Sequence, residues 1–190
     1  MKNLIPLLFI LACSSTKGPS SVQNAFFDSI REHCGKAYEG KVVTDIPKGS
    51  GFDQRLVMHV RECSDNELKI PFFVGEDRSR TWIITKTENG LRLKHDHRLK
   101  DGTPDESTMY GGDTTDKGTA HVQSFPADQY SKDMFVEQGI PQSVYNVWKV
   151  HIHDKTFSYQ LTRTNSDRDF KVDFDLTKPV TPPPAPWGHE

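Results

Sequence analysis

The sequence predicts a mainly β domain, an antiparallel meander that closes into a lipocalin-like barrel with an N-terminal helix and one inserted helix. Two observations carry this prediction. Most of the chain divides into short segments in which apolar and polar residues alternate, with turn signals between them. Only two segments show the spacing of three to four that is typical of a helix. Closure into a barrel would remove exposed sheet edges, and a two-sheet sandwich is the alternative.

Composition favours one domain with a core of moderate size. The chain has 190 residues, of which 26% are charged and 34% are hydrophobic. Its net charge is −2 and its pI is about 6.4, and charges of the two signs are mixed along the chain. Bulk charge therefore indicates neither a nucleic-acid partner nor an anionic membrane surface.

The first residues read as an export signal. A basic start precedes a short apolar run, which ends at residues 10–13 (ILAC). This ending resembles a bacterial lipobox, in which Cys13 would carry the lipid, although Leu is usual where Ile10 stands. A small, polar tether follows, and Ser14 favours the outer membrane by resemblance. An ordinary signal peptide with a chance cysteine is the alternative.

These features give the expected organisation of the chain. Residues 1–12 form the signal peptide, 13–21 the tether, 22–178 a single β-rich domain and 179–190 a proline-rich tail. The protein would be exported and held at the bacterial cell envelope, with the membrane as a partner through the lipid on Cys13.

Two cysteines remain once Cys13 is set aside. An exported domain meets oxidising conditions, so Cys34 and Cys63 are expected to form a disulfide. Two free buried thiols are the alternative. A two-cysteine metal site is disfavoured because the sequence has no C-x-x-C.

The elements follow in order. Helices are expected over residues 22–33, ended by Gly35, and from Asp128 as N-cap to residue 138. The proline-rich tail should be extended. Strands are expected over residues 41–45, 55–63, 68–74, 79–87, 91–98, 107–110, 119–125, 143–153, 156–163 and 169–176.

Residues 79–98 read as a β-hairpin with Asn89-Gly90 as a type I′ turn. This turn would place Trp82 opposite His97 and Ile84 opposite His95. Side chains alternate across a sheet, so Asp96 and Arg98 would lie on the outer face. The more apolar face should turn inward; it holds Arg80, Trp82, Ile84, Leu91, Leu93, His95 and His97.

The hairpin suggests a ligand pocket. Arg78 and Arg80 could bind a carboxylate or phosphate, and Trp82 and Tyr110 could supply flat apolar walls. The ligand-binding candidates are Arg78, Arg80, Trp82, His95, His97 and Tyr110. The alternative is an internal network in which the arginines pair with Glu76, Asp77 or Asp96. The leading hypothesis is a barrel that binds a small molecule or an envelope partner, without a cofactor.

A metal-dependent enzyme is the second hypothesis. A strand H-x-H places two imidazoles on one side, so His95 and His97 with His59 could hold a divalent transition metal. His151 and His153 form a second such pair. Nucleophilic catalysis has less support, because no G-x-S-x-G occurs and no cysteine is left over.

A third hypothesis is a structural interaction module that uses the tail and Trp187 as its contact. The favoured alternative is that the tail packs on its own domain.

Several strings in the chain also carry a resemblance: DRSRTW, HDHR, YGGD, FPAD and PPAPWG. The mature chain resembles a family of bacterial secreted proteins and lipoproteins of unknown function. The resemblance implies an exported single-domain protein and assigns no reaction or catalytic residue.

Overall fold

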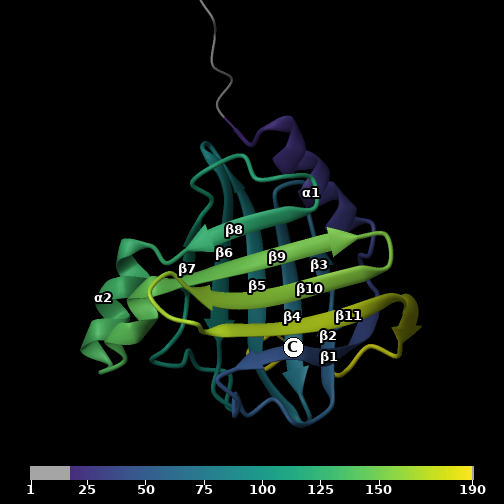
Figure 1. The fold of residues 1–190 in the computed structure, drawn as a ribbon. Coiled ribbons are helices and arrows are strands. Elements are labelled where there is room, and N and C mark those ends of the chain that lie inside the picture. Colours follow the sequence, from purple (N-terminus) through teal and green to yellow (C-terminus); the bar gives the residue numbers. More distant parts are fainter. Residues whose placement is uncertain (1–17, 190) are drawn as a thin grey trace, which may run out of the picture.

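The computed structural model describes residues 18–189. Figure 1 shows two α-helices, α1 (Ser21–Arg31) and α2 (Gln129–Glu137), and a short 3₁₀-helix η1 (Pro141–Tyr145) follows α2. The strands are β1 (Ala37–Ile46), β2 (Leu56–His59), β3 (Glu62–Cys63), β4 (Glu67–Val74), β5 (Asp77–Thr87), β6 (Gly90–His97), β7 (Tyr110–Asp113), β8 (Val122–Pro126), β9 (Asn146–His153), β10 (Thr156–Arg163) and β11 (Asp169–Val180).

The strands form one antiparallel sheet that curls into a nearly closed barrel. The order of neighbours is β7-β6-β5-β4-β2-β1-β11-β10-β9-β8, with β3 beside β4. Along this order every strand pairs with the next, and β1 pairs with β11, so the only seam in the described sheet lies between β7 and β8. In Figure 1 strands β8 to β11 cross in front of β4 to β6. The predicted meander and barrel are confirmed.

Two glycines let the seam close without a strand ladder. A Cβ on Gly112 would lie 1.8 Å from the carbonyl oxygen of Pro126, and one on Gly111 would lie 1.9 Å from that of Leu93. This close approach allows the Asp128 N–H to donate to the Gly111 carbonyl at 2.8 Å. The Ser131 hydroxyl contacts both the N and the O of Gly111, at 2.7 and 3.0 Å. The start of α2 therefore joins the two edges.

Helix α1 covers one end of the barrel (Figure 1). Ser20 and Gln23 form a capping box that fixes its start. Phe26 and Phe27 lie four and three residues before Ile30; all three are fully buried and belong to the main core. The end of the helix is tied to the sheet by the predicted Cys34–Cys63 disulfide, which is confirmed.

Aromatic side chains fill the interior. Trp82 stacks on Phe72 and on Tyr159, with ring centroids 4.8 and 4.4 Å apart. Phe157 and Phe174 contact Trp82 from the opposite wall at 6.2 Å. Stacked rings in such numbers give a densely packed core, as in small barrels whose interior is filled by side chains.

The C-terminal tail packs against the outside of the barrel. The C-terminal half of strand β4 is buried on both faces, because Phe73 joins Ala37 and Val57 in an outer apolar cluster that packs against Val180. Further along, the backbone N–H of Trp187 donates to the Arg78 carbonyl at 3.1 Å. The tail therefore contacts its own domain, as predicted.

Some predicted boundaries were wrong. The strand expected over residues 55–63 is divided into β2 and β3, and residues 143–145 of the strand expected over residues 143–153 belong to η1. Strand β11 runs on to Val180, into the expected tail. The predicted signal peptide, the lipidation site Cys13 and most of the tether lie outside the described residues. Within residues 18–189, no helix is long and apolar enough to cross a membrane.

Candidate functional site

The β5–β6 hairpin has a different register from the predicted one. Trp82 pairs with His95 and Arg80 with His97, and the two-residue loop is Glu88-Asn89. The predicted pairing was wrong by two positions. A shift of two leaves each side chain on its original face. His95 and Trp82 therefore point into the barrel as predicted, and Asp96 points outward.

Arg78 does not join the inward residues. Between the pairs Phe72–Arg80 and Val74–Asp77, one residue of β4 faces two residues of β5, Arg78 and Ser79. This β-bulge interrupts the alternation of side chains. Arg78 consequently reaches the outer face, where its Nη1 donates to the Ala185 carbonyl at 3.0 Å.

His95 is locked inside the barrel. Its side chain is 2% exposed, and its Nδ1 lies 3.1 Å from the Tyr110 carbonyl oxygen, which can only accept. Nδ1 therefore carries the proton, and Nε2 accepts the Tyr159 hydroxyl at 2.8 Å. Burial lowers the pKa of His95 to about 3, so the ring is neutral at pH 7. Both of its nitrogens are satisfied within the domain.

Tyr110 links His95 to His97, which lies nearer the end of the barrel. Its ring stacks on His95 at 4.5 Å, and its hydroxyl lies 3.1 Å from Nε2 of His97. Burial, and then the charge of Arg80, lower the pKa of His97 to about 4. Burial raises the pKa of Tyr110 to about 12. At neutral pH the pair is an uncharged hydrogen-bonding unit.

Arg80 supplies the charge of this region. Its guanidinium pairs with Asp77, and its side chain is 28% exposed. Burial alone would raise the pKa of Asp77, but hydrogen bonds from Ser79 and Arg80 hold it below its usual value. The guanidinium also lies 5.9 Å from the ring centre of Phe52, which packs on Phe72.

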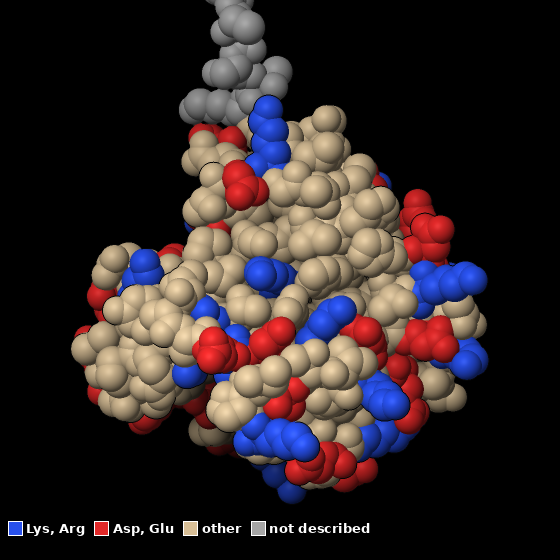
Figure 2. Space-filling view, viewed as in Figure 1, with Lys and Arg blue, Asp and Glu red and all other residues tan. Residues whose placement is uncertain are grey.

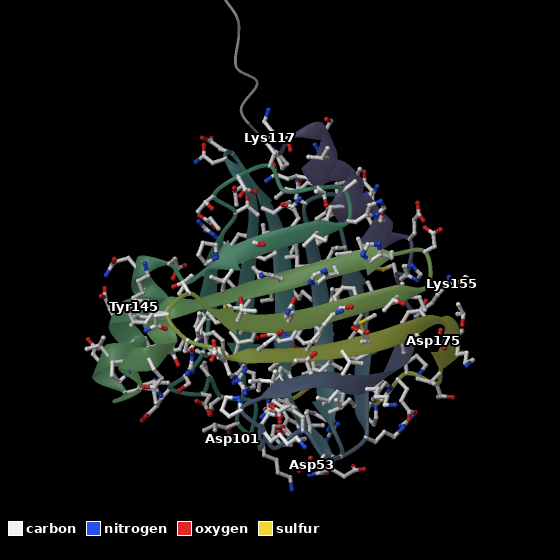
Figure 3. All side chains as sticks on the ribbon, in the orientation of Figure 1. Asp53, Asp101, Lys117, Tyr145, Lys155 and Asp175 are labelled. Carbon is white, nitrogen blue, oxygen red and sulfur yellow. A yellow bond between two sulfur atoms is a disulfide. The ribbon has the colours of Figure 1, made fainter. Side chains whose placement is uncertain are left out.

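We call Arg80, His97 and Tyr110 the mouth cluster. Phe52 belongs to the loop between β1 and β2, and Asp105 in the loop after β6 donates its N–H to the His97 carbonyl at 2.9 Å. In Figure 3, Asp53 and Asp101 mark these two loops at the end of the barrel away from α1. The mouth cluster therefore lies near the end that α1 leaves uncovered.

Asp96 anchors a second polar network, on the outer face. Its carboxylate is 2% exposed and accepts from Arg98 at 2.9 Å and contacts His189 at 2.7 Å. Burial opposes ionisation, but these two partners keep the pKa of Asp96 below its usual value. Arg61 donates to the His189 carbonyl at 2.7 Å. No pattern in the sequence singles out His189, a lone histidine in the tail.

The alternative metal site is not assembled. On β2, Leu56 and Met58 face the core and Val57 faces outward, so His59 shares the outer face and is separated from His95 and His97 by the wall. Among residues 18–189, no three His, Cys, Asp or Glu side chains lie close enough to hold a metal ion. His121 and His153 stack at 5.1 Å, as a pair of rings at the β8–β9 edge.

Charges on the face seen in Figure 2 are mixed, with Lys and Arg interspersed among Asp and Glu. No family model matches the chain, and no curated protein or solved structure matches it. The resemblance to secreted proteins and lipoproteins of unknown function stays a prediction. Function therefore has to be argued from the geometry alone.

Proposed function

We propose that this chain is a lipid-anchored protein of the bacterial cell envelope, at the outer membrane, which binds a small anionic molecule at the mouth of its barrel. The support for the anchor is the sequence of residues 10–13 and the polar stretch after it. The support for binding is the mouth cluster, in which one guanidinium stands beside two neutral hydrogen-bonding side chains.

The observation that carries the binding proposal is the position of Arg80. An arginine on the inner wall of an aromatic-filled barrel is costly unless it is paired, and here its partner is the adjacent Asp77 on the same strand. A ligand carboxylate or phosphate could take the place of Asp77 or use the remaining guanidinium donors. His97 and Tyr110 could then hydrogen-bond to the same ligand.

The filled interior limits the size of the ligand. Trp82 and Phe72 stack directly beyond the mouth cluster, so an enclosed ligand like that of larger lipocalin-type barrels has no room there. The ligand would be a small anion held at the mouth, with Phe52 against it.

Binding is tested by thermal unfolding with inorganic phosphate and with succinate. Each anion should raise the melting temperature of the wild type, since a ligand of the folded state stabilises it. R80Q should abolish the rise. R92Q is the matched control, because Arg92 lies on the outer face of the same hairpin and pairs with Asp113. An equal rise in R80Q would contradict the proposal.

A second readout is the titration of His97 by NMR. An anion bound beside Arg80 would add negative charge near the imidazole and raise its pKa from about 4. An unchanged titration at saturating phosphate or succinate would count against binding at the mouth.

The anchor is tested independently by Cys13→Ser. The wild type should fractionate with the outer membrane and C13S should be released, because the lipid would be lost. An identical distribution of the two proteins would defeat the lipoprotein proposal and leave the mouth unaffected.

A further inference from the structure

A cavity of about 350 Å³ lies outside the barrel, between its wall and the C-terminal tail. Its floor is Val57 and Phe73, from the outer apolar cluster, and its roof is Pro183 and Pro184. We call this cavity the tail groove. It is on the opposite side of the wall from the mouth cluster, because Val57 and Phe73 point away from the main core.

The tail is fixed on both sides of the groove. Before it, Val180 pairs with Ala37 at the end of β11. After it, Arg78 donates to the Ala185 carbonyl at 3.0 Å, and the Trp187 N–H donates to the Arg78 carbonyl at 3.1 Å. Residues 181–184 therefore cross the wall as an arch between two anchored points.

Proline keeps the arch from closing on the wall. Residues 182–184 are three consecutive prolines, which lack backbone N–H donors and hold the chain in an extended, stiff conformation. The three prolines therefore cannot donate backbone hydrogen bonds to the sheet beneath them. The groove is consequently preformed and would need little ordering to receive a ligand.

The charges at the groove are those of two arginines and one glutamate. Arg55 pairs with Glu39 through Nε at 2.9 Å, and its side chain is 57% exposed. Arg78 uses Nη1 for Ala185, and its other guanidinium N–H groups have no further hydrogen-bond partner among residues 18–189. Glu76 is exposed and also lines the groove. The lining residues thus carry one net positive charge beside an apolar floor, and Glu39, which pairs with Arg55, lies outside the lining.

We propose that the tail groove binds a small carboxylate with an apolar body. The apolar part would lie on Val57 and Phe73 under the prolines, and the carboxylate would take the free donors of Arg78, with Arg55 as a second charge. The site is independent of the mouth cluster, since it is on the other face of the sheet and shares no residue with it.

The experiment is a calorimetric titration of the full-length folded domain with octanoate, with neutral 1-octanol as the isosteric control. Octanoate should bind, and 1-octanol should bind at least tenfold more weakly, because it lacks the charge for the arginines. R78Q should weaken octanoate at least tenfold, the loss expected for a charge-assisted hydrogen bond. R55Q should weaken it several-fold, and R92Q should leave it unchanged.

Loss of the Arg78 guanidinium could also loosen the tail, so R55Q provides the check that leaves the tail contacts intact. Methyl NMR locates the ligand: octanoate should shift the Val57 methyl signals, and R80Q should bind it normally. The groove proposal would be overturned if octanoate did not bind, or if R55Q and R78Q bound it as tightly as the wild type. It would also be overturned if octanoate shifted only NMR signals of the mouth cluster. The last result would leave the mouth proposal standing.

Discussion

At the scale of single residues, the mouth shows how a barrel can hold histidines without charging them. His95 donates to a carbonyl and accepts from Tyr159, so the neutral tautomer satisfies both nitrogens. A proton on Nε2 would cost the hydrogen bond to Tyr159 as it stands, and it would bring a charge into an aromatic core. The surroundings therefore select the neutral form, and the two histidines couple folding to pH.

The pH dependence of stability follows from these pKa values. Below its ordinary pKa of 6.5, each histidine takes up a proton in the unfolded chain, whereas in the folded protein His95 and His97 do so only near pH 3 and 4. The free energy of unfolding should therefore fall as the pH drops from 6.5 towards 4. Each histidine contributes a slope of about 1.4 kcal/mol per pH unit.

Urea unfolding at several pH values between 7 and 4 measures this slope. H97Q, in which the amide can still bond to Tyr110, should remove about half of the slope that His95 and His97 contribute together. H153Q removes an exposed imidazole at the end of β9 and is the control. A wild-type slope in H97Q would show that His97 is not held neutral.

At the scale of elements, the hairpin shows what a sequence can and cannot predict. Alternation along residues 79–98 was enough to assign the inward face, because that assignment survives any shift of two. The cross-strand partners depended on which two residues form the turn, and Glu88-Asn89 took the place of Asn89-Gly90. The bulge at Arg78 and Ser79 has no signal in the local pattern, so Arg78 was grouped with Arg80 as a ligand-binding candidate although the two side chains lie on opposite faces.

The seam was equally hidden from the sequence. Gly111 and Gly112 match no turn pattern in the sequence. The need for glycine at these positions is visible only in the structure, where Pro126 and Asp128 lie against them. Contacts across a seam, where two edge strands meet without pairing, depend on the curvature of the whole sheet, which alternation does not encode.

The seam gives the second prediction. Gly112→Ala should destabilise the domain by about 3 kcal/mol, because the new methyl would overlap the Pro126 carbonyl and push β8 from β7. Gly139→Ala is the control: its φ is +72° and the space around it is open, so it bears only the cost of a left-handed alanine, about 1 kcal/mol. Chemical denaturation of both variants checks this, and equal losses would contradict the steric argument.

At the scale of the whole molecule, the chain is fastened at its two described ends. The Cys34–Cys63 disulfide joins two residues that are 29 positions apart in the sequence, and it holds the segment after α1 to β3. Removing it with C34A/C63A should lower the free energy of unfolding by about 3 kcal/mol, mainly by freeing the unfolded chain. Urea unfolding of wild type and variant under oxidising conditions measures the difference, and coincident transitions would contradict it.

The tail is held to the barrel by a second set of contacts, in which the buried carboxylate of Asp96 binds Arg98 and His189. Asp96→Asn should cost about 3 kcal/mol or more, because it leaves Arg98 and His189 without their carboxylate. The matched control is D113N, which breaks the half-exposed pair with Arg92 and should cost under about 1 kcal/mol.

Deletion of residues 182–190 should give a comparable loss and should uncover Val57 and Phe73 on the barrel wall. Thermal unfolding and limited proteolysis test both changes. In D96N the protease should cut the tail before the barrel, because the tail has lost the contact between Asp96 and His189. If the truncated domain melted with the wild type, the tail would contribute nothing to stability, and its packing on the wall would have to serve another purpose.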